Sequence, residues 1–251
     1  MTEFSHLAAT HTLVPVVRMV AADLETPVGA FLRVAARKTE AFLLESVEGG
    51  EKVGRYTFIG VRPYRTLTAC NGQITAQENG TARTYTGDVF EELKRSLSEH
   101  TTAKLPGLPP FTAGAVGFFA YDVVRRLEHL PEFAADELHV PDAHLMFFDQ
   151  VLAFDHVKKA IHLIVTAGAR HALTAQNAAA AFDDAEARLD ELEALLEAPL
   201  PKLPRSRNTE PLVITPRTKP EDFLAAVETT KEYIAAGDVF QCVLSQRFDC
   251  T

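Results

Sequence analysis

Four side chains that could recognise a small polar ligand lie around one tight turn. The segment LLESVEGGEKVGRYTFIG, residues 43–60, places Glu45 and Ser46 before the turn and Lys52 and Arg55 after it. A carboxylate can bind an ammonium group, whereas a hydroxyl and a cation can bind a carboxylate. The spacing therefore suits a pocket for a zwitterion, although charged side chains are also common at the exposed end of an ordinary hairpin.

A second segment with distinctive spacing, AGAVGFFAYD, covers residues 113–122. Its Gly114 and Gly117 permit a close backbone approach within a strand-like run. The segment lacks the Lys-Ser/Thr pair of a phosphate-binding Walker loop and the third glycine of a dinucleotide fingerprint. Close packing between strands is therefore the interpretation that these residues favour.

The third segment, GDVFQCVLSQRF, covers residues 237–248. Its alternation predicts a strand over Val239–Phe248, with Gln241, Ser245 and Arg247 on one face. An amide, a hydroxyl and a guanidinium in register suit a polar anionic ligand. The alternative is an edge strand with one hydrated face.

The elements that must position these residues do not alternate as β-α-β units. Asn71-Gly72 between two β-rich runs predicts a hairpin, and Asp88 with Glu91 predicts the start of a short helix. Two later strands are expected to be joined through Asp155-His156, and residues 174–197 are expected to form a long helix. Runs of strands with helices set apart from them indicate an α+β fold with largely antiparallel sheets and flanking helices.

The clearest linker is the Pro-rich stretch near residue 200. We expect an N-terminal domain at 1–203, a linker at 204–215 and the start of a second domain at 216–251. In this last segment Thr218 and Glu221 predict a capped helix start, and Gly237 predicts the helix end. One helix and one strand cannot close a core of their own, so this unit either docks on the preceding domain or begins a second domain that is cut off. The alternation of the final strand favours a truncated second domain.

Composition excludes several classes of protein. The chain has 251 residues, 47% of them apolar, and a net charge of −9, which argues against a nucleic-acid or acidic-membrane partner. The first residues do not resemble a secretory signal, and no apolar run approaches the ~18 residues of a membrane span. Three cysteines without a CxxC pair predict neither a disulfide framework nor a cysteine zinc site. We therefore expect a soluble cytoplasmic protein.

In this order and at these separations, the three segments resemble the large subunit, component I, of anthranilate synthase, a chorismate-utilising enzyme. The similarity spans essentially the whole chain and is strongest at 41–63, 113–122 and 216–248. The resemblance implies conversion of chorismate to anthranilate and pyruvate in tryptophan biosynthesis, with Mg²⁺ as cofactor. It also implies a separate glutamine amidotransferase subunit, component II, that delivers ammonia from glutamine.

The resemblance assigns roles to particular residues. The LLES segment is similar to the feedback site for tryptophan, so that Glu45 and Ser46 would hold the polar end of the effector, with Lys52 or Arg55 nearby. Gln241 matches a position, on the nucleophile side of the catalytic site, where family members that add water to chorismate carry a lysine. A lysine can act as general base toward water, whereas ammonia is already a nucleophile and needs no such base. Gln241 therefore favours amination.

The family chain continues beyond this one, and its later part supplies the Mg²⁺-binding carboxylates, the acid/base residues and most of the chorismate pocket. We therefore expect this chain to be the N-terminal, regulatory portion of component I, without metal ligands and inactive alone. Two alternatives are kept. One is the large subunit of 4-amino-4-deoxychorismate synthase in the folate pathway, which shares the architecture and a glutamine at position 241. The other is a stand-alone amino-acid-binding module without catalysis.

Overall fold

Strands and helices are described in the computed structural model for residues 1–36, 40–45, 54–78, 80–130, 136–202 and 211–250. The chain divides into two units, Met1–Pro201 and Lys202–Thr251, and each is described by itself. Most of the predicted linker, residues 204–210, lies outside the described part of the chain.

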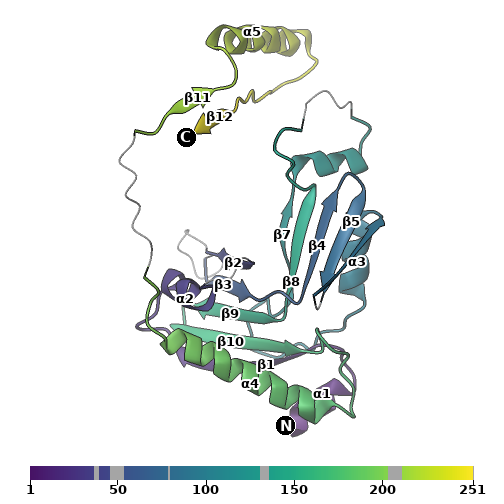
Figure 1. Ribbon diagram of the computed structural model, residues 1–251, viewed down its shortest axis with the longest axis vertical. Coiled ribbons are helices and arrows are strands. Elements are labelled where there is room, and N and C mark those ends of the chain that lie inside the picture. Colours follow the sequence, from purple (N-terminus) through teal and green to yellow (C-terminus); the bar gives the residue numbers. More distant parts are fainter. Residues whose placement is uncertain (37–39, 46–53, 79, 131–135, 203–210, 251) are drawn as a thin grey trace. The chain divides into compact units, whose positions relative to one another are not determined.

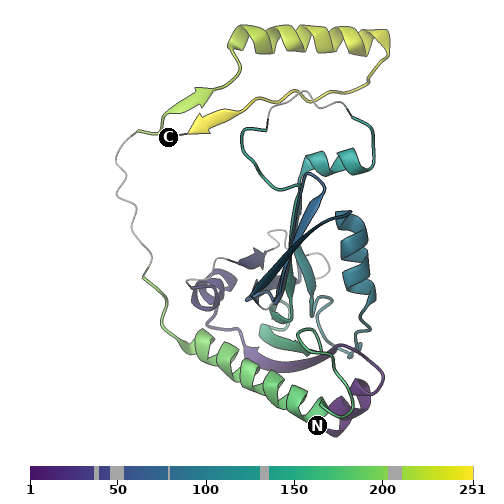
Figure 2. The same cartoon turned by 45° about the vertical axis from the view of Figure 1, so that its right-hand side comes forward.

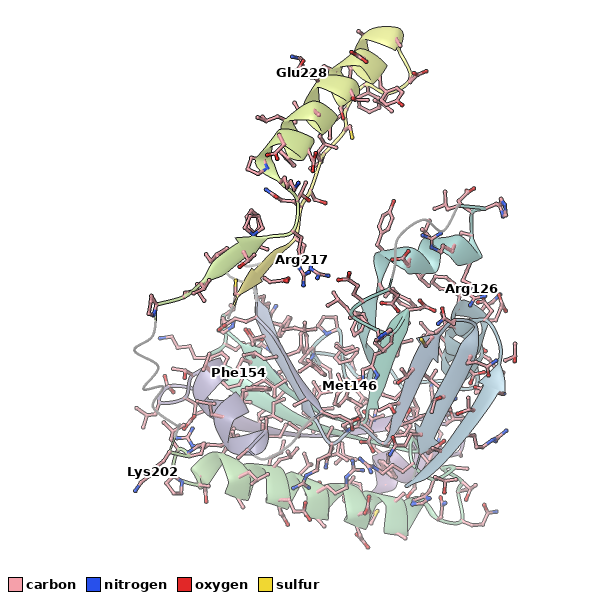
Figure 3. The ribbon with its side chains drawn as sticks, turned by 45° about the horizontal axis from the view of Figure 1, so that its top comes forward. Arg126, Met146, Phe154, Lys202, Arg217 and Glu228 are labelled. Carbon is pink, nitrogen blue, oxygen red and sulfur yellow. The ribbon has the colours of Figure 1, made fainter. Side chains whose placement is uncertain are left out.

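The first sheet of the larger unit has the strand order β1-β10-β9-β3-β2, and all neighbouring strands are antiparallel. The strands are β1 (Val14–Ala21), β10 (Ala160–Ala167), β9 (Gln150–Asp155), β3 (Tyr56–Val61) and β2 (Ala41–Leu44). Helices α1 (Thr2–Ala8), α2 (Pro27–Val34) and α4 (Ala178–Glu197) cover one face, with α4 along β1 and β10 (Figure 1). Leu152 and Phe154, the latter labelled in Figure 3, belong to the core between this face and the helices.

The second sheet has the strand order β6-β5-β4-β8-β7, again with antiparallel neighbours. The strands are β6 (Thr81–Thr86), β5 (Gln73–Glu78), β4 (Arg65–Cys70), β8 (Ala143–Phe148) and β7 (Gly114–Phe119). Helix α3 (Val89–Ser98) packs on one face over Leu67 and Ile74, and the 3₁₀ helix η1 (Tyr121–Arg126) follows β7 (Figure 2). Two antiparallel sheets with helices on their faces confirm the predicted α+β class.

Two local predictions are confirmed in the second sheet. Asn71 and Gly72 both have positive φ, at 49° and 77°, and form the two-residue turn between β4 and β5. The Asp88 carboxylate accepts hydrogen bonds from the backbone N–H groups of Phe90 and Glu91 at 2.8 and 3.1 Å. This cap satisfies two of the N–H groups that the start of α3 leaves free.

Asp149 is the single residue between β8 of the second sheet and β9 of the first, so the chain changes sheets there. Its carboxylate, 1% exposed, accepts from Nε and Nη2 of Arg170 at 2.8 and 3.0 Å and lies 2.8 Å from Nη2 of Arg188 on α4. Arg170 also donates to the backbone carbonyl of Arg62, just after β3. This cluster therefore ties the junction between the sheets to α4 and to the end of β3.

His162 on β10 is a buried titratable group outside that cluster. Its neighbours Ile161 and Leu163 face the core with the helices, so His162 points to the opposite face of the sheet. The side chain is buried, and neither ring nitrogen has a hydrogen-bond partner among the described residues. Burial lowers its pKa, partly opposed by the nearby Asp155 carboxylate.

In the described residues of the smaller unit, 202 and 211–250, the structure has one two-stranded ribbon and one helix. Strand β11 (Ile214–Pro216) pairs antiparallel with β12 (Phe248–Cys250), and α5 (Pro220–Ala236) lies between them in the sequence. The helix ends at Gly237 in the left-handed conformation, as predicted. The predicted cap at Thr218 is wrong, because Pro220 occupies the first helical position and Lys219 becomes the N-cap without a side-chain hydrogen bond.

The strand predicted over Val239–Phe248 is wrong for most of its length, since only Phe248 of that range lies in a strand. A strand needs neighbours to pair its backbone N–H and C=O groups, and within the described part of this unit the only pairing is that of β11 with β12. Phe240 and Val243 are 95% and 81% exposed. The alternation thus marks a segment suited to a sheet whose neighbouring strands this unit does not supply.

We predict that Asp149→Asn lowers the free energy of unfolding by about 3 kcal/mol, because two buried or half-buried guanidinium groups would then face a neutral amide. Urea denaturation followed by circular dichroism measures the change. Glu191→Gln on α4 is the control, since it removes a carboxylate from the exposed pair with Arg62 and should cost less than about 1 kcal/mol. Equal losses in the two variants would contradict the role given to Asp149.

A second prediction concerns the dependence of stability on pH. The folded protein protonates His162 less readily than the unfolded chain, whose histidine pKa is about 6.5. The unfolding free energy should therefore be highest above that pH and fall as the pH decreases below it. We expect His162→Leu to reduce the fall between about pH 7 and pH 5. Urea denaturation at several pH values checks this, and an unaltered slope in His162→Leu would refute it.

Candidate functional site

The first two residues of the LLES segment, Leu43 and Leu44, end edge strand β2 of the first sheet, which pairs with β3 so that Leu44 lies opposite Phe58. This antiparallel register places Glu45, just after β2, and Arg55, just before β3, at the same end of the strand pair. Glu45 is exposed, whereas Ser46 and Lys52 lie outside the described residues. The structure therefore brings two of the four predicted ligand-binding residues to one end of a hairpin.

Arg55 is held in place by a buried carboxylate. Its Nε and Nη2 donate to the two Asp155 oxygens at 3.1 and 2.7 Å, and its guanidinium lies 4.9 Å from the centre of the Tyr56 ring. The Asp155 side chain is 0% exposed, whereas that of Arg55 is 30% exposed. Arg55 therefore presents a fixed guanidinium whose charge Asp155 already balances, and its role toward an effector stays a prediction.

Asp155 is a residue of this site that sequence reasoning missed, because Asp155-His156 was interpreted only as a strand connection. Its Oδ1 also accepts from the backbone N–H groups of Val157 and Lys158, both at 3.1 Å. Burial alone would raise the pKa of this carboxyl, but the hydrogen bonds from Arg55 and the turn together lower it. An aspartate directly before a turn was the one available signal, since such residues often bond to backbone N–H groups two or three positions later.

An aromatic cluster lies beside the hairpin. Phe42 of β2 makes edge contacts with Phe148 and Phe111 at 4.8 and 6.2 Å between ring centres, and Phe111 contacts Phe58 of β3 at 5.8 Å. The ring of Phe42 crosses Gly60, where a Cβ atom would lie 2.1 Å from Phe42 Cε1. Aromatic surface beside fixed charges suits a ligand with one flat apolar part and one charged part.

The second segment, AGAVGFFAYD, forms β7 at the edge of the second sheet. A Cβ atom at Gly117 would lie 1.9 Å from the His144 carbonyl oxygen on β8, and Gly114 has a φ of 143°. Both positions therefore require glycine for backbone reasons. This agrees with the packing interpretation of the motif.

The third segment does not bring its polar residues together on a strand. Gln241 lies in the exposed, irregular stretch between α5 and β12, so the predicted shared face with Ser245 and Arg247 is not formed. Arg247 instead binds Asp249, which also pairs with Arg217. The role of Gln241 near a nucleophile stays a prediction.

Two further features of the described residues concern membrane-spanning helices and groups of side chains that could bind a metal ion. None of their helices is both long and apolar enough to cross a bilayer. Among the same residues, no group of three or more His, Cys, Asp and Glu side chains could hold a metal ion.

Comparison with known proteins gives consistent matches. The sequence model of the chorismate binding enzyme family matches residues 39–251. Anthranilate synthase component 1 of Mycobacterium tuberculosis H37Rv is 43% identical over 252 residues, which cover 98% of this chain and 48% of that protein. The corresponding protein of Acetivibrio thermocellus is 36% identical over 254 residues, 98% of this chain and 50% of the relative.

A solved structure extends the similarity to the fold. The crystal structure of anthranilate synthase component I from Streptococcus pneumoniae TIGR4 matches 92% of this chain and 48% of that chain, with 28% identity and a TM-score of 0.62. The chain spans about half the length of the curated relatives described above. With a family match that covers most of its residues, the chain belongs to the chorismate binding enzyme family.

Proposed function

We propose that this chain is the N-terminal part of an anthranilate synthase component I, which converts chorismate and ammonia to anthranilate and pyruvate in tryptophan biosynthesis. The observation that carries the proposal is the 43% identity over 98% of the chain to a relative named anthranilate synthase component 1. Because the match covers only half of that relative, the activity is proposed for a longer protein that contains this chain.

The same relatives bear on the two alternatives. Those described above carry the name anthranilate synthase component 1, which favours this activity over 4-amino-4-deoxychorismate synthesis. In a stand-alone amino-acid-binding module, the apolar side chains of Phe240 and Val243 would stay exposed to water, with no further protein to cover them. Exposed apolar side chains in a segment with strand-like alternation instead favour a unit that packs against further protein.

For the catalytic part, we place Gln241 on the nucleophile side of the chorismate site. Its neutral amide cannot remove a proton from water, and this suits a reaction with ammonia. We propose that component II, a glutamine amidotransferase subunit, delivers the ammonia, and that carboxylates in a later part of the longer protein hold Mg²⁺. We also place the protein in the cytoplasm, where its three free cysteines would stay reduced.

For regulation, we propose that tryptophan binds at the end of the β2–β3 hairpin. Glu45 is exposed and free to accept from the effector ammonium, and Ser46 and Lys52 would hold its carboxylate. Arg55, fixed on Asp155, would orient the polar end of the ligand, and the neighbouring aromatic cluster offers surface for the indole ring.

The proposal predicts that the 251-residue chain alone forms no anthranilate from chorismate, Mg²⁺ and an ammonium salt. Gln241 lies in an exposed segment without neighbouring strands, so it cannot orient a substrate. Anthranilate fluorescence measures the reaction, and the longer gene product serves as the positive control. Product formation by the 251-residue chain would refute the need for a further catalytic part.

A further prediction concerns feedback inhibition in the longer gene product. Glu45→Gln should raise the tryptophan concentration for half-inhibition about 10-fold, the equivalent of one charge-assisted hydrogen bond, with the KM for chorismate unchanged. Glu40→Gln, which removes a carboxylate just before the other end of β2, is the matched control and should leave inhibition unaltered. If both variants keep the original sensitivity, tryptophan does not bind through Glu45.

A further inference from the structure

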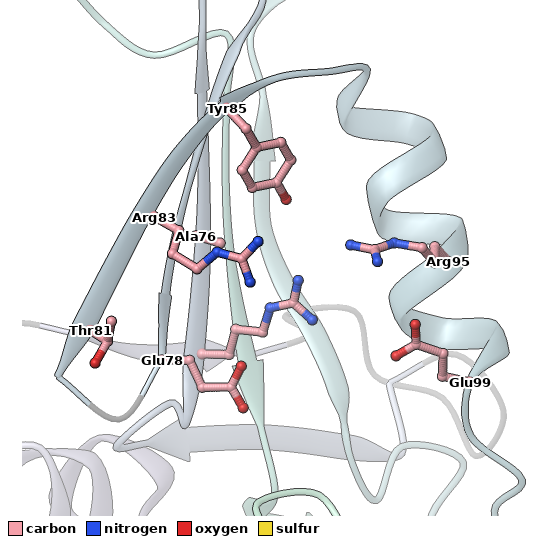
Figure 4. Close-up of a pocket in the computed structure, with 8 residues that line it drawn as sticks. Ala76, Glu78, Thr81, Arg83, Tyr85, Arg95 and Glu99 are labelled. Atoms are coloured by element: carbon pink, nitrogen blue, oxygen red, sulfur yellow. The ribbon is translucent and has the colours of Figure 1, made fainter.

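A hollow lies on the second sheet, whereas the β2–β3 hairpin belongs to the first. It has a volume of about 530 Å³, opens to solvent, and is bordered by one face of β4, β5 and β6 together with α3 (Figure 4). In the register of these strands, Ala76 lies between Leu67 and Arg83. Because the side chain of Ala76 is short, it leaves a space between the longer side chains around it, such as Arg65 and Arg83.

The charged side chains of this hollow are sorted by position. Register places Glu78 between Arg65 and Thr81, and the Arg65 guanidinium reaches Glu92 on α3. Arg83 and then Tyr85 follow Thr81 toward the other end of the same face. Glu99, the C-cap residue of α3, lies about one turn beyond Arg95. Figure 4 accordingly shows Tyr85, Arg83 and Arg95 toward one end and the two glutamates toward the other.

A buried carboxylate below the hollow fixes part of this arrangement. Glu92 accepts from Nη2 of Arg65 at 2.7 Å and from Nη2 of Arg95 at 2.7 and 2.6 Å. Burial alone would raise the pKa of Glu92, but the hydrogen bonds from Arg95 and Tyr85 together lower it. One carboxylate therefore holds two guanidinium groups and leaves N–H donors of both for another acceptor.

Among the described residues, the remaining charged side chains of the hollow have no salt-bridge partner, and all of them are exposed to solvent. Arg83, Glu78 and Glu99 form no salt bridge with any other described residue, although all three line the same space. If Glu92 is included, the positive charges of Arg65, Arg83 and Arg95 equal in number the negative charges of Glu78, Glu92 and Glu99. A ligand with a net charge would leave one end of the hollow unmatched, whereas a dipolar ligand would match both ends.

We propose that this hollow binds a small zwitterion of the free amino-acid class. Arg83 and Arg95 would donate to its carboxylate, and Glu78 and Glu99 would accept from its ammonium group. The site lies on a different sheet from the proposed tryptophan site, so it does not depend on that proposal. The volume admits any single amino acid, and the charged groups recognise the common ammonium and carboxylate rather than the side chain.

The proposal can be tested by saturation-transfer NMR. The 251-residue chain is titrated with each proteinogenic amino acid except tryptophan, and binding is measured from the NMR signal of the amino acid. We expect at least one to bind saturably with a millimolar Kd, about −4 kcal/mol. Arg83→Gln and Glu78→Gln should each weaken this binding at least ~5-fold, since each removes one charge-assisted contact. Lys94→Gln, an exposed charge change on α3, and Glu45→Gln, at the β2–β3 hairpin, should leave it unchanged.

Two analogues of the tightest-binding amino acid distinguish a site that recognises both charged groups from one that binds only an anion or only a cation. One analogue lacks the ammonium group and the other lacks the carboxylate, and both should bind at least ~10-fold more weakly. Circular dichroism confirms that each variant is folded. The proposal is overturned if no amino acid binds, if either analogue binds as tightly as the parent, or if Lys94→Gln weakens binding as much as Arg83→Gln.

Discussion

The buried carboxylate of Asp149 holds together the part of the protein on which both candidate sites depend. It lies where β8 passes into β9, and each of these is an internal strand of its own sheet. Arg170 and Arg188 balance its charge from the loop after β10 and from α4. Because breaking a buried ion pair is much more costly than losing an exposed one, this junction constrains the position of one sheet against the other. The β2–β3 hairpin lies on the first sheet and the arginine- and glutamate-lined hollow on the second.

The two units differ in how much apolar surface they bury. Among the described residues of the larger unit, buried side chains form one cluster beneath α1, α2 and α4 and another beneath α3. In the smaller unit, α5 has no buried residue, and Leu224, Phe240 and Val243 are exposed. A single helix and a short ribbon cannot bury enough apolar area to offset the entropy of ordering the chain. Under the proposed function, these side chains pack against a later part of the longer protein.

Local patterns in the sequence were sufficient wherever the structure is set by neighbours in the chain. Asn71-Gly72 predicted its hairpin, and Asp88 predicted the start of α3. The register of that hairpin, once known, also places Arg65 opposite Glu78. By contrast, the partner of Asp155 lies 100 residues away, and Asp149 is separated from Arg170 by 21 residues. No short sequence pattern identifies ion pairs between residues so far apart in the chain. Likewise, the alternation of polar and apolar residues over 239–247 indicates a segment that could join a sheet, but it does not show whether partner strands are present.

The central claim is that this chain supplies the N-terminal half of a chorismate-using synthase. The most direct test is the intact mass of the native gene product, measured by mass spectrometry on protein purified from its source. The account predicts a mass near twice the 27.5 kDa of this chain, as for relatives of which it spans about half. A native product of 27.5 kDa would contradict it.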